Sequence, residues 1–437
     1  MKKWLSFVMS ITLAVGLLAG CASTATPSAA PAESSTETTA PAATSSVDSI
    51  TLYQNKVEID EQLKAFAAEY SNTAGVTVNI ETVGGGADFG GSLKAKFASG
   101  AAPDIFVIDG PSGYELWKDS IADLSDQAWV SDTDFGFKNP EGKVVGFPVA
   151  IEGYGMAYNK DILAKAGVDP ATLTTIDGYK AAFEKIDSQK EDLGLDSVVS
   201  MAASTGTGMT WVTGLHNFNV YLAAGLPIGD TSIVDKMNNG EVDADRLAQY
   251  ADYVALLFQY SNKDILLNGN YDAQAQAFAM GKTAFIHQGN WLDPTLVTLG
   301  ATFDMAYAPH APFSTPTDGV LAAPPSWYCV NSQSAGAEEA KKFLTAIATT
   351  EAGHKYMVEE AGMIPAFKSV QLKPTLPLSK SIMEWAAAGK TYDWHFGKMP
   401  DGFGMNTLGP IYEQLAAGNI DTKTFAEMVT SEINALK

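Results

Sequence analysis

Side chains that could perform catalysis or hold a metal do not form a known motif in this 437-residue chain. The sequence lacks His-Glu-x-x-His, Cys-x-x-Cys, Gly-x-Ser-x-Gly and the full Walker phosphate-binding pattern. Its five histidines, at positions 216, 287, 310, 354 and 395, do not have the spacing of metal ligands. Two carboxylates, Asp109 and Glu152, remain as a pair that could cleave a glycosidic bond by acid–base chemistry. We expect no cofactor and no bound metal.

Charge and composition restrict the partners further. The formal net charge is −22, and acidic proteins repel phosphate backbones, so we expect no nucleic-acid partner. The single arginine, Arg246, argues against a site that clamps a phosphate or carboxylate group. The 8 Trp, 16 Tyr and 20 Phe residues are numerous enough to fill a core and still line a cleft with aromatic rings.

The first 47 residues predict export and a tether. Two lysines precede a short apolar stretch, which is typical of a secretory signal peptide over residues 1–20. The sequence Leu18-Ala19-Gly20-Cys21 resembles the bacterial lipobox, and this resemblance implies that the thiol of Cys21 is lipidated. An ordinary signal peptide that happens to meet a cysteine is the alternative. Residues 21–47 are mostly Ala, Ser, Thr and Pro and predict a flexible linker. The protein would then be lipid-anchored at the cell membrane, facing the extracellular or periplasmic side.

Hydrophobic spacing after residue 47 alternates between strand and helix patterns. Residues 59–70 carry apolar side chains at helical spacing, and residues 76–80 alternate as a strand. The apolar run 105–108 is typical of a strand buried on both faces. Further helices are predicted at 179–186, 247–258, 340–347 and 425–436, and further strands at 50–52, 144–151, 156–158 and 283–286. This order predicts an α/β fold, and about 390 patterned residues require two domains.

Four stretches together resemble family 1 of the extracellular solute-binding proteins, the maltose-binding type that serves ABC importers. In chain order they are Ala102-Pro103-Asp104-Ile105, the segment 142–160, the segment 280–291 that ends in Gly289-Asn290-Trp291, and Ala337-Glu338-Glu339-Ala340. The resemblance covers essentially all of residues 48–437. It implies a two-lobed fold of the periplasmic-binding-protein type, in which each lobe is a mostly parallel sheet flanked by helices. It also implies that the protein is not an enzyme.

The lobes of this family are joined by several chain crossings and close on a ligand held between them. Transferred to this chain, the crossings fall near residues 150–153, 289–291 and 327–331. The first lobe would then comprise residues 48–151 with 290–327, and the second lobe residues 152–289 with 328–437.

A sugar ligand would need aromatic rings and polar side chains in one place. The C–H faces of a pyranose stack on aromatic rings, and its hydroxyls donate and accept hydrogen bonds. The resemblance implies that Trp291 meets the sugar and that Glu152 contacts it. A tryptophan packed in the core and a hinge carboxylate bonded to backbone amides are the alternatives. The other candidate ligand-binding residues follow strands or lie in loops: Asn55, Lys56, Asp109, Trp211, Asn217, Asn290, Trp394, His395 and Phe403.

The expected function is that of a monomeric, lipid-anchored protein that captures a neutral carbohydrate, in particular an oligosaccharide. It would deliver this ligand to the permease subunits of an ABC importer. Two alternatives stay open at this point. One is an exported glycoside hydrolase that uses Asp109 and Glu152, and the other is a binder of a non-sugar solute on the same scaffold.

Overall fold

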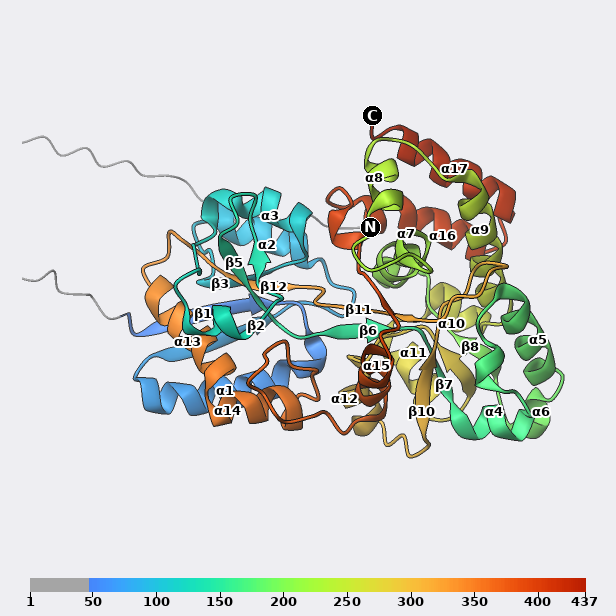
Figure 1. Cartoon of the computed structure of the whole chain (residues 1–437), viewed down its shortest axis with the longest axis horizontal. Helices are drawn as coiled ribbons and strands as arrows, with labels where there is room; N and C mark the ends of the chain where they lie inside the picture. Colours follow the sequence, from blue (N-terminus) through green and yellow to red (C-terminus); the bar gives the residue numbers. More distant parts are fainter. Residues whose placement is uncertain (1–46) are drawn as a thin grey trace, which may run out of the picture. The chain divides into compact units, whose positions relative to one another are not determined.

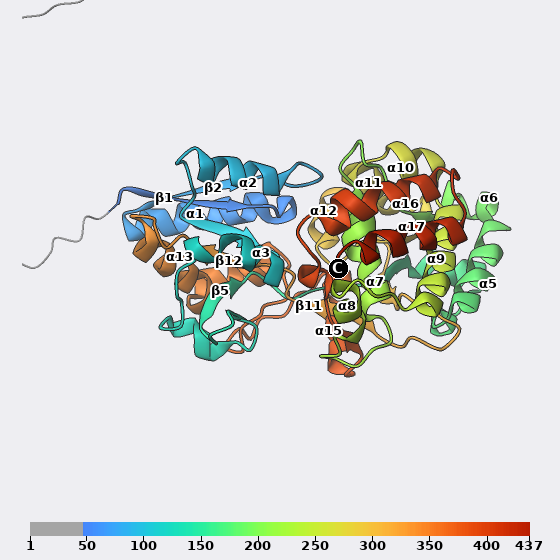
Figure 2. The same ribbon diagram turned by 90° about the horizontal axis from the view of Figure 1, so that it is seen from above.

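The computed structural model describes residues 47–437, which belong to one unit of the chain. Two separate β-sheets within this unit define two lobes, which are drawn on the left and right of Figure 1 and again from above in Figure 2. A third, three-stranded sheet of order β13-β11-β6 lies where the lobes meet. Its strands are β6 (Glu152–Tyr154), β11 (Val320–Ala323) and β13 (Thr391–Tyr392).

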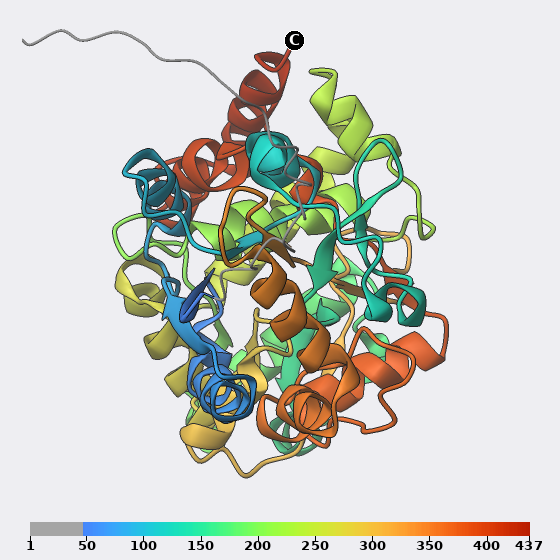
Figure 3. The ribbon, with the colours of Figure 1, turned by 90° about the vertical axis from the view of Figure 1, so that its left-hand side faces the viewer.

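The first lobe is built on a six-stranded sheet of order β2-β1-β3-β12-β5-β4. Its strands are β1 (Ser49–Gln54), β2 (Thr77–Thr82), β3 (Ile105–Ile108), β4 (Phe137–Lys138), β5 (Val144–Pro148) and β12 (Trp327–Val330). Its helices are α1 (Asp60–Ala74), α2 (Phe89–Ala98), α3 (Pro111–Trp117), α13 (Ala337–Thr349) and α14 (Glu351–Lys355). Figure 3 shows this lobe in front, with the blue N-terminal segments beside the orange segments around residue 350.

Alternating side chains of β3 explain why the first sheet carries helices on both faces. Ile105 and Val107 belong to one buried cluster, which includes Leu63 of α1. Phe106 and Ile108 point the other way, because successive side chains of a strand alternate, and they join a second buried cluster. The strand buried on both faces that this run of four apolar residues predicted is therefore confirmed.

The second lobe contains a four-stranded sheet of order β10-β7-β9-β8 and most of the helices. Its strands are β7 (Met156–Asn159), β8 (Ser197–Ser200), β9 (Thr283–Ile286) and β10 (Met305–Ala308). Its helices are α4 (Lys160–Ala166), α5 (Ile176–Asp187), α6 (Lys190–Leu193), α7 (Phe218–Ala223), α8 (Ser232–Asn238), α9 (Ala244–Gln259), α10 (Lys263–Asn268), α11 (Tyr271–Ala279), α12 (Leu292–Thr298), α15 (Pro377–Ala387), α16 (Gly409–Ala416) and α17 (Thr422–Asn434). One large buried cluster joins these elements.

Strand pairing corrects part of the expected division of the chain. Strand β10, expected in the first lobe, pairs with β7 in the second sheet, whereas β12 pairs with β3 and β5 in the first. The helices α13 and α14, expected in the second lobe, also belong to the first. The chain passes between the sheets at residues 149–155 as expected, but it does not cross at 289–291, since β9 and β10 share one sheet.

Strand directions also differ from the expected mostly parallel sheets, although the α/β architecture is confirmed. In the first sheet β1 runs parallel to β2 and β3, but β12 is antiparallel to both of its neighbours. In the second sheet only β8 and β9 are parallel. Apolar periodicity does not encode strand direction, so strands that enter a sheet late in the chain could not be oriented from the sequence.

The expected signal peptide, Cys21 and almost all of the expected linker lie outside the described residues. Within residues 47–437, none of the helices combines the length and the apolar character that a membrane crossing requires.

Candidate functional site

A small cavity, about 10 Å³ in volume, lies where the two lobes and the crossing segment meet. This volume is about that needed for one water molecule, so the cavity as it stands is too small for a sugar ring. The lining residues are Lys56, Glu58, Ile59, Ala150, Ile151, Glu152, Asn290, Trp291, Pro294, Ala361, Gly362 and Met363.

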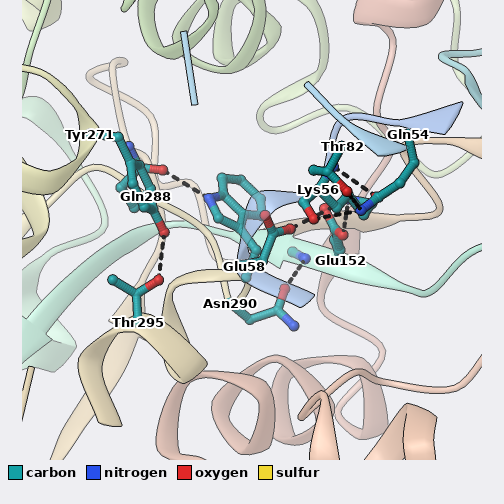
Figure 4. Close-up of polar contacts among 11 residues, drawn as sticks. Gln54, Lys56, Glu58, Thr82, Glu152, Tyr271, Gln288, Asn290 and Thr295 are labelled. Atoms are coloured by element: carbon teal, nitrogen blue, oxygen red, sulfur yellow. Dashed lines mark hydrogen bonds and ion pairs between the residues drawn. The ribbon is translucent and has the colours of Figure 1, made fainter. Parts of the chain in front are cut away.

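A charged cluster forms one wall of this crevice, as Figure 4 shows. The Lys56 ammonium donates a hydrogen bond to Oε1 of Glu152 and lies 3.9 Å from Oε1 of Glu58. The side chain of Gln54 fixes the backbone at Lys56, because its Oε1 accepts from Lys56 N at 2.8 Å and its Nε2 donates to Lys56 O at 2.9 Å. The end of β1 therefore places a lysine against the carboxylate that opens β6.

Burial and mutual charge shift the pKa values in this cluster. Burial lowers the pKa of Lys56, but the carboxylates of Glu152, Glu58 and Asp109 outweigh this effect and raise it overall. Burial raises the pKa of Glu58 to about 7 although Lys56 opposes the shift. Burial likewise raises the pKa of Asp109 to about 6. The ammonium group of Lys56 thus faces three carboxylates, and the cluster has no unpaired positive charge for an anionic ligand.

Trp291 lines the cavity from the other lobe, and further aromatic rings pack around it. The ring of Trp291 lies 4.8 Å from that of His216, 6.1 Å from Trp394, 6.2 Å from Tyr154 and 6.4 Å from Trp211, measured between centroids. Tyr154 lies in β6, and Trp211 and His216 lie in the turn η5 (Trp211–Asn217). Trp291 follows β9, and Trp394 follows β13. The second lobe therefore presents several rings close to the charged cluster of the first.

Trp291 is held in a fixed orientation. Its Nε1 donates to Oε1 of Gln288 at 2.9 Å, and only 9% of the residue is exposed. A Cβ atom on Gly289 would clash with the indole ring, so the residue at 289 must be a glycine for the ring to fold back over the chain. The ring joins the lobe core on one side and lines the cavity on the other.

The structure brings several predicted site residues together. Lys56, Glu152, Asn290 and Trp291 line the same cavity. Asp109 interacts electrostatically with Lys56 and Glu152. The half-buried Trp211 and Trp394 stand beside Trp291, and the buried Nε1 of Trp394 has no hydrogen-bond partner among the described residues.

Asn290 also has a structural role. Its Oδ1 accepts from the N–H of Gly153 at 2.7 Å, and its Nδ2 donates to Oγ of Ser379 at 3.1 Å. The side chain thus ties the crossing segment to α15.

Other predicted residues lie in the interior of the second lobe instead. Asn217 is fully buried and accepts a hydrogen bond from the hydroxyl of Tyr250 at 2.6 Å. His395 is buried, and its Nε2 bonds to the carbonyl of Asp230 at 2.9 Å. Phe403 belongs to the buried cluster of the lobe. Asn217 and His395 thus each make an internal hydrogen bond, while Nδ2 of Asn217 and Nδ1 of His395 are buried without a partner among the described residues.

Asn55 is half-buried at the end of β1, next to the glycine-rich loop 84–86. Its Oδ1 is buried and has no hydrogen-bond partner among the described residues.

Two polar residues were missed by the sequence analysis: Glu58, which lines the cavity, and His216, which packs against Trp291. Glu58 follows Lys56 by two positions, and this proximity was the available signal. His216 lies between the predicted Trp211 and Asn217, but an isolated histidine in a loop carries no signal of its own. Among the described residues, no group of three or more His, Cys, Asp or Glu side chains has the geometry of a metal site.

The rim of the crevice is closed by direct contacts between loops of the two lobes. A Cβ atom on Gly86, in the loop after β2, would lie 2.7 Å from the carbonyl oxygen of Thr207. Oγ of Ser112 in α3 donates to the carbonyl oxygen of Gly397 at 3.0 Å. Lys94 of α2 pairs with Asp401 at 2.9 Å. The lobes therefore touch at their rims as well as at the charged cluster.

Comparison with known proteins places these features in context. Residues 61–389 match the model of a family described as bacterial extracellular solute-binding protein. The chain is 26% identical over 427 residues to an uncharacterised ABC transporter extracellular-binding protein of Pyrococcus horikoshii, covering 92% of this chain and 91% of that protein. It is 27% identical over 284 residues to a maltooligosaccharide ABC transporter solute-binding lipoprotein of Streptococcus pneumoniae, covering 61% of each chain.

The fold is similar to that of a sugar transporter protein from Bacillus licheniformis solved with stachyose. The TM-score is 0.71 at 20% sequence identity, and the match covers 89% of this chain and 100% of the other. The two-lobed fold expected from the sequence is therefore confirmed.

Proposed function

The chain belongs to the bacterial extracellular solute-binding proteins, and from this premise we propose that it captures a neutral oligosaccharide in the crevice between its lobes. The observation that carries the proposal is the lining of a single cavity by Trp291 on one side and by Lys56 and Glu152 on the other. An aromatic face beside hydrogen-bonding groups matches a pyranose, whose C–H faces are apolar and whose edge is polar.

The charges near the site favour an uncharged ligand. Lys56 is already paired with Glu152. The guanidinium of Arg246 donates from Nε to the carbonyl of Tyr221 at 2.6 Å and from Nη2 to that of Ala224 at 2.7 Å, and it lies 4.3 Å from the ring centroid of Phe313. A phosphate or carboxylate on a sugar would therefore meet buried carboxylates without a free cation.

Binding and closure follow from the same contacts. When the lobes separate, Trp291 offers a stacking surface, and Lys56 and Glu152 exchange their mutual hydrogen bond for sugar hydroxyls. A ligand that contacts both lobes favours the closed arrangement, because only there are both sets of contacts made. Asn290 keeps the crossing segment in place during this motion through its bond to Gly153.

The proposal includes neither bond cleavage nor a catalytic residue. The hydrolase alternative would use Asp109 and Glu152, yet both carboxylates are engaged electrostatically by Lys56, and none of the relatives named above is described as a hydrolase.

Calorimetry with maltotetraose, raffinose, stachyose and a matched oligogalacturonide tests the proposal. We expect binding of at least one neutral oligosaccharide and none of the anionic one. Chromatography of the same mixtures after long incubation should recover the sugar intact. Shortened products, or selective binding of the anionic sugar, would contradict the proposal.

We also propose that lipid on Cys21 anchors a monomer at the outer face of the membrane, where it hands the sugar to ABC permease subunits. The lipobox-like sequence and the described lipoprotein character of the pneumococcal relative support this. Metabolic labelling with a palmitate analogue should mark the wild-type protein but not a Cys21→Ala variant, and only the variant should appear in the medium. Retention of the variant at the membrane would contradict the anchor.

A further inference from the structure

We infer that His216 is a direct ligand contact of the crevice, where its imidazole binds a hydroxyl of the sugar; this inference rests on the proposed function. No family motif quoted above includes this residue.

His216 differs from the other four histidines in its hydrogen bonds. The rings of His287 and His310 bond to each other at 2.9 Å, and each has a further partner. His354 and His395 each bond to a backbone carbonyl, at 2.7 Å and 2.9 Å. The ring of His216 makes no hydrogen bond within the described part of the chain, although the residue is half-buried. Its nitrogens are therefore free to pair with a partner in the crevice.

His216 lies among aromatic rings and packs against Trp291, which lines the cavity. Its ring centroid lies 4.8 Å from that of Trp291, 5.2 Å from Trp211, 5.4 Å from Trp394 and 5.5 Å from Phe396. These distances are typical of aromatic contacts. A sugar that stacks on Trp291 would lie directly beside the imidazole.

The local backbone holds this ring in place. The hydroxyl of Tyr154 donates to the carbonyl oxygen of His216 at 2.6 Å, which ties the turn η5 to strand β6. The turn has the wide π-helical form, and such turns are frequent at functional sites. Gly214 in the same turn packs against Gly404, so close that a side chain at either position would clash. The segment therefore has little freedom to withdraw the imidazole.

The chemical state of the imidazole suits a hydroxyl. Burial lowers the pKa of His216 well below its usual value, and the nearby His287 and Lys56 lower it further. The ring is then neutral near pH 7, with one N–H donor and one acceptor nitrogen. A sugar hydroxyl also donates and accepts, so the two can form a mutual hydrogen bond. A neutral ring also retains its stacking with the surrounding aromatic side chains.

The test compares His216→Phe, which keeps the ring but removes both nitrogens, with His216→Asn, which keeps a donor and an acceptor. We expect His216→Phe to weaken binding of the best sugar from the panel by roughly 10-fold, and His216→Asn to recover part of this loss. The matched control His354→Phe, in the first lobe, should leave the affinity unchanged.

If the wild-type protein binds no neutral oligosaccharide, the proposed function fails. If it binds one and His216→Phe binds it equally well, only the present inference is overturned. A measurement on the wild-type protein covers the case in which the variants fold poorly. Addition of the sugar should shift the imidazole ¹⁵N resonances of His216 and leave those of His354 in place, and unshifted His216 resonances would overturn the inference.

Discussion

Gly110 of the first lobe and Gly397 of the second lie against each other: a Cβ atom on Gly110 would be 3.3 Å from Cα of Gly397. A Cβ atom on Gly397 would lie 2.5 Å from the carbonyl oxygen of Asp109. Both distances are shorter than ordinary contacts of a Cβ atom. The closed arrangement of the lobes therefore depends on the absence of side chains at this point of the rim.

The first prediction follows from this contact. Gly397→Ala should weaken sugar binding by roughly 10-fold or more, because the added methyl group meets backbone that cannot yield and holds the rims apart. The melting temperature without ligand should change little, since each lobe keeps its own core. The control Gly90→Ala adds a methyl group in α2 with only the Asp88 carboxylate nearby, at 3.9 Å, and should bind normally. Equal affinity of Gly397→Ala and wild type would show that the rims need not meet.

The second prediction concerns pH. Burial raises the pKa of Glu58 to about 7, so the folded protein holds this proton more tightly than the unfolded chain does. The free energy of unfolding should then fall as the pH rises from about 4 to about 7. Glu58→Gln removes this contribution, and the variant should be more stable than wild type at pH 8, with a smaller difference at pH 4.

Denaturant titrations at both pH values measure the effect of Glu58→Gln. The exposed neighbour Glu61 offers the control Glu61→Gln, which should follow the wild-type pH dependence. Asp109 shifts in the same direction as Glu58, so some decline with pH should remain in Glu58→Gln. A variant that is less stable than wild type at pH 8 would contradict the interpretation.

The third prediction assigns Asn290 a structural role. Asn290→Ala leaves the buried N–H of Gly153 without its 2.7 Å partner, and we expect a loss of about 1–3 kcal/mol in the free energy of unfolding. Asn290→Asp keeps the acceptor for Gly153 and should lose less. Denaturant unfolding distinguishes the two, and equal stability of all three proteins would rule out this role.

The fourth prediction separates the site from the core. Trp291→Phe replaces the indole with a smaller ring and removes the donor to Gln288. It should therefore weaken sugar binding several-fold and lower the melting temperature. Trp129, buried in the first-lobe core, provides the control. Trp129→Phe should lower the melting temperature as well but leave the affinity unchanged. If Trp291→Phe and Trp129→Phe changed the sugar affinity to the same extent, Trp291 would act only as a core residue.

Much of the fold could be predicted from the sequence because it depends on local periodicity. The predicted strand over residues 105–108 and the predicted helices over residues 247–258 and 425–436 correspond to β3, α9 and α17. The partners of β10 and β12 could not be predicted, because short apolar strands fit either sheet and only tertiary packing decides between them. The predicted crossing between the lobes at residues 289–291 was wrong for this reason.

The structure brings Lys56, Glu152 and Trp291, which follow strands or match family positions, to one cavity, and their contact with a ligand stays a prediction. The structure places Asn217 and His395 in the interior of the second lobe, where each makes an internal hydrogen bond. Such residues have the same appearance in sequence whether they bind a ligand or satisfy a buried partner.

A crystal structure with the neutral oligosaccharide that binds best in the calorimetric panel would show directly whether the sugar occupies the crevice beside Trp291. We expect a sugar ring within about 4 Å of the Trp291 indole, with hydroxyls bonded to Lys56, Glu152 or both, and an intact glycosidic bond. A sugar bound elsewhere, for example at the exposed surface hollow beside Ile228 and Tyr392, with none in the crevice, would contradict this expectation.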